Sequence, residues 1–322
     1  MDEASLGAML ASTLRVSTPL ILCALAGLFS ERSGVVDIGL EGKMLFAAFA
    51  AGAAGSVFGS ITVALLVAMG VAVALSWMHG LACVSYRGDQ VVSGVAINII
   101  AVGLTVVLGI AWFHQGGQTP PVATDVRIQP LFPDGGNWLS WIPFLGRVLG
   151  EGLLTHSALV YCSYALVPAV WWLVFHTRFG LRLRAVGENP QMVDAAGVSV
   201  KRLRYTALTL NGMLCGLAGS YLVLAQSANF SANMTAGRGF MALAALIFGR
   251  WHPFGALWAC LLFGFLDAAA IRMQGVPLPI VGEVPVQFIQ ALPYVLTVVL
   301  LAGFIGKAVA PQALGKPYLK ER

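Results

Sequence analysis

Long uninterrupted apolar runs constrain this chain more than any other feature of its sequence. Several of them exceed the roughly 18 residues that mark a membrane-spanning helix. Hydrophobic residues make up 58% of the chain and charged residues 10%, whereas a soluble domain carries about 25% charged residues. The sequence therefore predicts an all-α integral membrane protein.

The apolar segments set the number of helices to expect. They cover residues 6–29, 41–57, 60–86, 91–113, 157–176, 206–226, 238–249, 254–272 and 286–305. We therefore expect about nine transmembrane helices, within a range of eight to ten.

The basic residues indicate which ends of these helices face the cytoplasm. Residues 177–205 form the one long basic segment, with six Lys or Arg side chains. Short loops rich in Lys and Arg stay in the cytoplasm, so the hairpin at Arg87, the turn at Arg250 and the C-terminal tail are expected on that side. The Lys and Arg residues behind the net charge of +5 cluster in these short loops and at the C-terminal end. This distribution fits a membrane protein better than a nucleic-acid-binding one.

Two short spans each follow a Gly-rich polar stretch, at 33–43 and 231–239. Both look like broken helices, and by the orientation above they run in opposite directions. Spans one to four and six to nine thus form an inverted repeat, an arrangement that places a translocation path at the repeat interface near the midplane. The expected division is a first repeat at 1–113, an extracytoplasmic loop at 114–156, a connecting helix at 157–176, a cytoplasmic loop at 177–205 and a second repeat with its tail at 206–322.

Charged residues in the broken segments are candidates for that path. Asp37 and Glu41 lie four residues apart beside glycines, and intramembrane carboxylates are costly unless they face partners or water. They could instead occupy the cytoplasmic border beside Lys43. Arg238 occupies the matching place in the second repeat, where a helix N-terminus and a cation would favour a polar or anionic group, or it could anchor a loop.

Uncharged polar and aromatic residues complete the set of path candidates. Ser93, Asn98 and Gln226 offer donors and acceptors that suit a neutral polar solute. Phe240, with Trp112 and Phe113, could stack on a flat ring, although aromatic residues in membrane proteins more often serve packing or the interface.

Motifs of other chemistries do not appear. The five histidines have no metal-ligand spacing, and Gly42-Lys43 lacks the remaining positions of a phosphate loop. No nucleophile elbow is present. We expect no catalytic residue, no metal and no cofactor bound by this chain, and no nucleic-acid partner.

The basic loop contains a predicted short helix in the stretch ENPQMVDAAGVSV. Asn189 can cap it, Pro190 suits its first turn and Gly197 ends it. A short amphipathic helix between basic arms can insert into a partner's groove. It could also be an ordinary loop lying on lipid headgroups.

Four segments give the chain a family resemblance over nearly its whole length. They are TPLILCALAGLFSERSGVVDIGLEGKML at 18–45, VVSGVAINIIAVGLT at 91–105, GENPQMVDAAGVSVKRLRY at 187–205 and GFMALAALIFGRWHPFGALWACLLFG at 239–264. In these the chain resembles permease subunits of bacterial ABC importers for nucleosides and simple sugars, in the superfamily of ribose and branched-chain amino acid permeases.

The resemblance implies a set of roles and partners. Residues 188–200 correspond to the coupling helix that docks on an ATPase, with Glu188, Asn189, Asp194, Ala195, Ala196 and Gly197 as its contact residues. Asp194 departs mildly from the glutamate that is commoner in importers. The implied partners are a second permease subunit in a heterodimer, a cytoplasmic ATPase that binds ATP and Mg²⁺, and an extracytoplasmic substrate-binding protein. The implied location is the bacterial inner membrane, with a cytoplasmic C-terminus.

An ion-coupled secondary transporter of a small polar solute is the alternative. Inverted repeats and broken helices fit it equally well, and Asp37, Glu41 and Asp267 would then be coupling carboxylates. Such a carrier has no need of a structured docking helix at 177–205, so that loop separates the two hypotheses.

Overall fold

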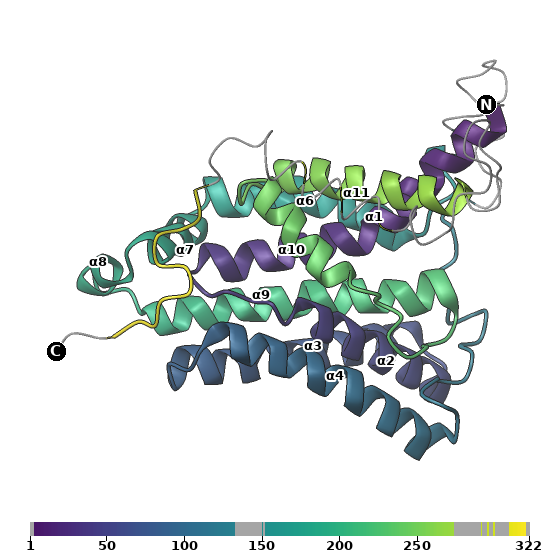
Figure 1. Ribbon diagram of the computed structural model, residues 1–322, viewed down its shortest axis with the longest axis horizontal. Helices are drawn as coiled ribbons and strands as arrows, with labels where there is room; N and C mark the ends of the chain where they lie inside the picture. Colours follow the sequence, from purple (N-terminus) through teal and green to yellow (C-terminus); the bar gives the residue numbers. More distant parts are fainter. Residues whose placement is uncertain are drawn as a thin grey trace.

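A computed structural model describes residues 3–132, 150, 152–273, 291, 295, 299 and 309–319. Within them the chain is helical (Figure 1). The α-helices are α1 (Glu3–Arg32), α2 (Leu40–Phe58), α3 (Ile61–Gly80), α4 (Gln90–Phe113), α6 (Ala158–His176), α7 (Arg178–Glu188), α8 (Pro190–Ala195), α9 (Val200–Tyr221), α10 (Arg238–Phe248) and α11 (Pro253–Met273). Two π-helical turns, η1 (Leu81–Ser85) and η3 (Leu222–Ser227), extend α3 and α9.

Eight of the nine apolar segments expected from the sequence coincide with helices, which confirms the all-α membrane class. Six described helices are long and apolar enough to cross a membrane, and α10 is a shorter apolar helix. The segment expected at 286–305 falls almost wholly outside the described residues. The expected total of about nine helices therefore stays a prediction.

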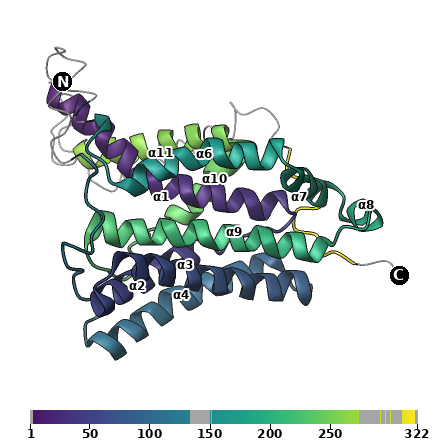
Figure 2. The same ribbon diagram turned by 180° about the vertical axis from the view of Figure 1, so that it is seen from behind.

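The long helices lie side by side along the longest axis of the molecule (Figures 1 and 2). Helices α1 and α9 form the centre, since 67% and 78% of their apolar windows are buried, against 28% for α3 and 22% for α4. Helices α6 and α11 lie on one side of this pair, and α2, α3 and α4 lie on the other. The exposed helices carry apolar side chains outward, as a surface in contact with lipid requires.

Small residues allow α9 to pack closely on α3. A Cβ atom added at Gly212 would lie 2.6 Å from the Cα of Val73, and one at Gly216 would lie 2.5 Å from the Cα of Met69. Two glycines four residues apart form the small-residue stripe that lets membrane helices approach backbone to backbone. This stripe fixes the position of α9 against the first half of the chain.

The two ends of the helix bundle differ in character. We call the end that carries α7, α8 and the tail at 309–319 the basic end. The hairpin at Arg87 belongs to it as well, because the hydroxyl groups of Ser85 and Tyr205 lie 2.8 Å apart near the start of α9. The opposite end is closed by residues 119–128, which hydrogen-bond the chain after α9; the Thr119 N–H, for example, donates to the Phe230 carbonyl oxygen at 3.2 Å.

The two predicted breaks are confirmed as helices that begin inside the bundle. Helix α2 starts at Leu40 and runs to the opposite end, where Gly55 packs against Val122. Helix α10 starts at Arg238 and runs to the basic end, where the following Trp251 contacts α1. The two half-helices thus point in opposite directions, as an inverted repeat requires. The division of the whole chain into repeat units stays a prediction.

Candidate functional site

The N-termini of the two half-helices meet in the middle of the bundle, and Glu41 joins them. Its carboxylate accepts hydrogen bonds from the Gly237 N–H at 2.8 Å and the Gly239 N–H at 2.6 Å. These are among the first N–H groups of α10, which have no partner within the helix. The side chain of Glu41 is buried, so its negative charge faces the positive end of the α10 dipole without competition from water.

Asn98 of α4 binds the N-terminus of α2 in the same way as Glu41 binds that of α10. Its side-chain oxygen accepts from the Gly42 N–H at 2.8 Å, and its amide nitrogen donates to the Ile38 carbonyl oxygen at 3.0 Å. Gly42 has no room for a side chain, because a Cβ atom there would lie 2.8 Å from the Asn98 Cα. Asn98 thereby holds the start of α2 against α4.

A buried ion pair stabilises the segment that precedes α2. The Lys43 ammonium and the Asp37 carboxylate lie 2.5 Å apart, and both side chains are fully buried. The ammonium also donates to the Asn211 side-chain oxygen at 3.1 Å, and that amide bonds Ser76 and the backbone of α1. A buried pair of this kind is stable only when its remaining donors and acceptors are satisfied, and here α2, α3, α9 and α1 together supply them.

Ser93 contributes to the same segment through a histidine. Its hydroxyl lies 3.0 Å from the Nδ1 atom of His79, and the Nε2 atom of that ring lies 2.9 Å from the Val36 carbonyl oxygen. The Val36 N–H donates to the Gln90 side chain at 2.6 Å. Both polar groups of Val36 are thus held by side chains, which is how an irregular segment is tolerated inside a membrane protein.

The other path candidates contribute no side chain to the hydrogen bonds described above. Arg238 is half-buried at the start of α10, between Gly237 and Gly239. Phe240 is 47% exposed. Gln226 is exposed at the opposite end, in the turn that ends α9.

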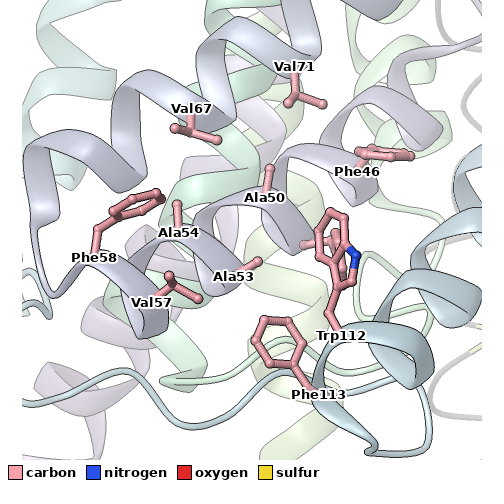
Figure 3. Close-up of a pocket in the computed structure, with 11 residues that line it drawn as sticks. Phe46, Ala50, Ala53, Ala54, Val57, Phe58, Val67, Val71, Trp112 and Phe113 are labelled. Atoms are coloured by element: carbon pink, nitrogen blue, oxygen red, sulfur yellow. The ribbon is translucent and has the colours of Figure 1, made fainter.

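Trp112 and Phe113 line an apolar hollow of about 340 Å³ between α2, α3 and α4 (Figure 3). The remaining lining residues are all apolar and are Phe46, Phe49, Ala50, Ala53, Ala54, Val57, Phe58, Val67 and Val71. The Phe49 ring lies 5.9 Å from the Trp112 ring and 5.3 Å from the Phe230 ring, centroid to centroid. Ligand sites for polar molecules carry a few oriented polar groups, which this hollow lacks. Of the three predicted stacking residues, only Trp112 and Phe113 therefore come together, in an apolar hollow that Phe240 does not line.

The basic end carries a compact helical unit formed by α7, α8 and the first turn of α9. The Asn189 side chain accepts from the Met192 N–H at 3.1 Å, Pro190 is the first helical residue, and Gly197 has a φ of +79°. The short helix expected from the sequence is therefore confirmed with its cap and its end. Glu188 is the last residue of α7, Asp194 and Ala195 end α8, and Ala196 is the C-cap of α8.

This unit, which we call the docking unit, has a hydrophobic core of its own. Val186, Val193 and Val200 are buried against one another, separately from the main core of the bundle. Glu188, Asn189, Ala195, Ala196 and Gly197 are exposed around that core, and Asp194 is half-exposed. The unit therefore presents the end of α8 on a small rigid base at the tip of the molecule (Figure 1).

The last residue of α1 connects this end to the second broken helix. The Arg32 guanidinium donates to the Trp251 carbonyl oxygen at 3.1 and 2.8 Å, and the Trp251 indole donates to the Glu31 carboxylate. The neighbouring His252 ring lies 5.1 Å from the Phe175 ring. Burial, followed by the charge of Arg32, lowers the pKa of His252, so the ring is neutral at pH 7 and adds no charge beside Arg32.

No sequence motif identified several residues of this site. Lys43, His79 and Asn211 are single polar residues within apolar stretches, and such residues must find partners inside the protein. That rule marks them as buried but does not say which residues they contact. Among the described residues, no group of three or more His, Cys, Asp or Glu side chains could hold a metal ion.

Comparison with known proteins places the chain among permeases. The family model of the branched-chain amino acid transport system permease component matches residues 9–304. The guanosine ABC transporter permease protein NupQ of Bacillus subtilis is 40% identical over 96% of this chain and 95% of its own length. The nucleoside ABC transporter permease protein NupC of Lactococcus lactis is 39% identical, with 98% and 97% covered. The putative glucose ABC transporter permease protein TsgC13 of Haloferax volcanii is 32% identical, with 97% and 98% covered.

Proposed function

The chain belongs to the family of branched-chain amino acid transport system permease components, and we propose that it is the membrane-spanning subunit of an ATP-driven importer of nucleosides. The observation that carries the proposal is its similarity, over nearly the full length of both chains, to permeases named for guanosine and for nucleosides. A related sugar is the second substrate class, because a permease named for glucose is also similar.

The docking unit supplies the contact with a separate ATPase in this proposal. The residues around its tip, Glu188, Asn189, Asp194, Ala195, Ala196 and Gly197, would sit in a groove of that partner. A short helix on a rigid base suits this role, because helix-in-groove contacts need a preformed partner. ATP and Mg²⁺ would bind the ATPase, so this chain contributes geometry to transport and no hydrolytic group.

The broken helices supply the moving part. Closure of the ATPase dimer would displace α8 and the end of α1, and the Arg32–Trp251 hydrogen bonds would carry that displacement to α10. The start of α10 is bound to Glu41 of α2. Rocking of one half-helix against the other at this point would open the path alternately to each side, as in other transporters built from inverted repeats.

The two membrane sides follow from the basic end. In this proposal the basic end lies in the cytoplasm together with the C-terminus, because short loops rich in Lys and Arg stay on that side, and the opposite end would receive substrate from an extracytoplasmic binding protein. The apolar outward faces of α3 and α4 are available for a second, homologous permease as well as for lipid. We propose a heterodimer in the bacterial inner membrane.

Uptake measurements on the assembled transporter test the proposal. The chain would be reconstituted in proteoliposomes with its second permease, its ATPase and its binding protein, and uptake of radiolabelled guanosine, other nucleosides and glucose would be followed. A partner ATPase without its catalytic glutamate and an uncoupler serve as the two controls.

The two controls separate the two hypotheses. Nucleoside uptake that needs an active ATPase and resists the uncoupler supports the importer. Uptake that survives loss of the ATPase and collapses with the ion gradient would instead identify a secondary carrier. Faster uptake of glucose than of any nucleoside would keep the importer and change its substrate class.

A further inference from the structure

The tail at 309–319 lies against two segments that are far from it in the sequence. The Ala313 N–H donates to the Gly187 carbonyl oxygen at 2.8 Å, and the Gly315 N–H donates to the Gly34 carbonyl oxygen at 3.2 Å. The Gln312 N–H also donates to the Glu188 carboxylate at 3.3 Å. The tail, drawn in yellow, crosses from the docking unit to the end of α1 in Figure 1. We call residues 311–318 the strap.

One side of the strap belongs to the docking unit. Tyr318 packs against the separate core of Val186, Val193 and Val200. Gly187, which receives the strap hydrogen bond, also touches the last residue of α1, because a Cβ atom there would lie 2.3 Å from the Arg32 carbonyl oxygen. The docking unit is thus joined to the bundle at a place where α7, α1 and the strap meet.

The other side of the strap reaches the first break. Gly34 opens the segment that leads to Asp37 and α2, and its φ is +85°. A Cβ atom at Gly34 would lie 3.0 Å from the Arg204 Nη2 atom and 3.2 Å from the Ala313 carbonyl oxygen. The buried Arg204 in turn donates to the Ser33 carbonyl oxygen at 3.1 Å. The strap and the base of α9 therefore hold the start of the broken segment from two sides.

We propose that the strap is a positioning element of transport, which passes movement of the docking unit to the first broken helix. This inference rests on the proposed function, because it assumes that an ATPase moves α8. Val186, Val193 and Val200 form a core apart from that of the bundle, whereas α7 also joins the main core through Leu183. Movement of α8 therefore reaches the bundle through α7, through α9 and through the strap. Backbone hydrogen bonds from the strap to Gly187 and to Gly34 make one such connection, and it leads to Asp37, Lys43 and the Glu41 contact.

A purely structural role of the strap and a role in transmitting movement predict different effects when the strap is lost. If the strap only completes the docking surface, its loss weakens ATPase binding, since Tyr318 lines a hollow with Asp194 and Lys201. If the strap transmits movement, its loss leaves ATPase binding intact and reduces transport for each ATP hydrolysed. The ratio of uptake to hydrolysis therefore decides between the two roles.

The experiment uses the assembled transporter with two variants and one matched control. Gly34→Ala puts a methyl group between Arg204 and the strap, and a chain that ends at Ala310 lacks the strap. Gly59→Ala is the control, because Gly59 also has a positive φ, +59°, but has no neighbour within 4 Å of an added Cβ atom. Copurification of the ATPase, ATP hydrolysis and nucleoside uptake are measured for each.

For both strap variants we expect normal copurification and a fall of about tenfold in uptake per ATP hydrolysed, the usual scale of coupling between sites. The Gly59→Ala control should keep the ratio of the unmodified chain. An unchanged ratio in the shortened chain, or loss of copurification, would overturn the inference. Failure of the shortened chain to reach the membrane would also count against it, because a transmitting link is not needed for folding. Ion-driven uptake by the unmodified chain would instead refute the proposed function.

Discussion

The contact between Glu41 and the start of α10 can be tested by Glu41→Gln. The carboxylate accepts two hydrogen bonds, from Gly237 and Gly239. An amide keeps one acceptor oxygen and turns an NH₂ group toward the other N–H, so one charge-assisted bond is lost. Such bonds contribute about 1.5–3 kcal/mol each, and removal of the negative charge from the helix N-terminus adds about 0.3–1 kcal/mol.

A loss of about 2–4 kcal/mol at this contact would raise the population of the separated state by roughly 30- to 700-fold, since 1.4 kcal/mol corresponds to a factor of ten. The buried Thr235, two residues before Gly237, reports that separation. In a background where the exposed Cys162 is replaced by serine, Thr235→Cys should be labelled by a small thiol reagent much faster when Glu41→Gln is also present.

Asp89→Asn is the matched control for this experiment. The Asp89 carboxylate also binds a helix N-terminus, through the Val92 N–H at 2.9 Å, but that bond is exposed. Asparagine caps a helix about as well as aspartate, so the labelling rate of the Thr235→Cys thiol should not change. Equal labelling rates with Glu41 and with glutamine at that position would refute the view that this carboxylate holds the two half-helices together.

Three further sets of changes test other parts of the site. Lys43→Ala leaves the buried Asp37 charge unpaired and should destabilise the protein by about 3–5 kcal/mol, which is measured as a lower melting temperature in detergent. Asp37→Asn combined with Lys43→Met removes both charges and should recover most of the lost stability. Gly216→Val should prevent accumulation of folded protein, because a Cβ atom there lies 2.5 Å from the Met69 Cα, whereas Gly70→Ala, in open space, should have no effect. Asp194→Lys should leave the melting temperature within about 2 °C of its original value, as surface changes usually do, whereas Gly197→Arg should lower it, because a φ of +79° disfavours any side chain there. Both variants should still fold and should abolish copurification of the ATPase; retained copurification would remove the docking assignment.

Sequence patterns located the helices and both breaks because these depend on local composition. Apolar runs of sufficient length form helices in a bilayer whatever their neighbours are, and glycine-rich polar stretches at 33–43 and 231–239 interrupt them. The short helix after Asn189 was equally predictable, since a cap and a proline act within one turn. These features needed no knowledge of tertiary contacts.

The partners of the polar residues could not be predicted in the same way. Asp37 and Glu41 look alike in the sequence, yet one pairs with Lys43 and the other binds the start of α10, far along the chain. Their roles depend on which helices lie side by side, and that order follows from packing details such as the Gly212–Gly216 stripe. The contacts of the strap could not be predicted for the same reason, because its hydrogen bonds use backbone groups that any sequence supplies.

The meeting of the two helix N-termini bears on the kind of solute that could pass. In transporters with broken helices, free N–H groups at such ends attract anionic parts of the substrate. Here the Gly237 and Gly239 N–H groups are bound by Glu41, and the Gly42 N–H is bound by Asn98. The positive end of α10 is already balanced by a carboxylate of the protein, and the Lys43 charge is balanced by Asp37. These backbone groups and Lys43 thus offer little attraction to an anion, and an uncharged nucleoside fits them better than a nucleotide would.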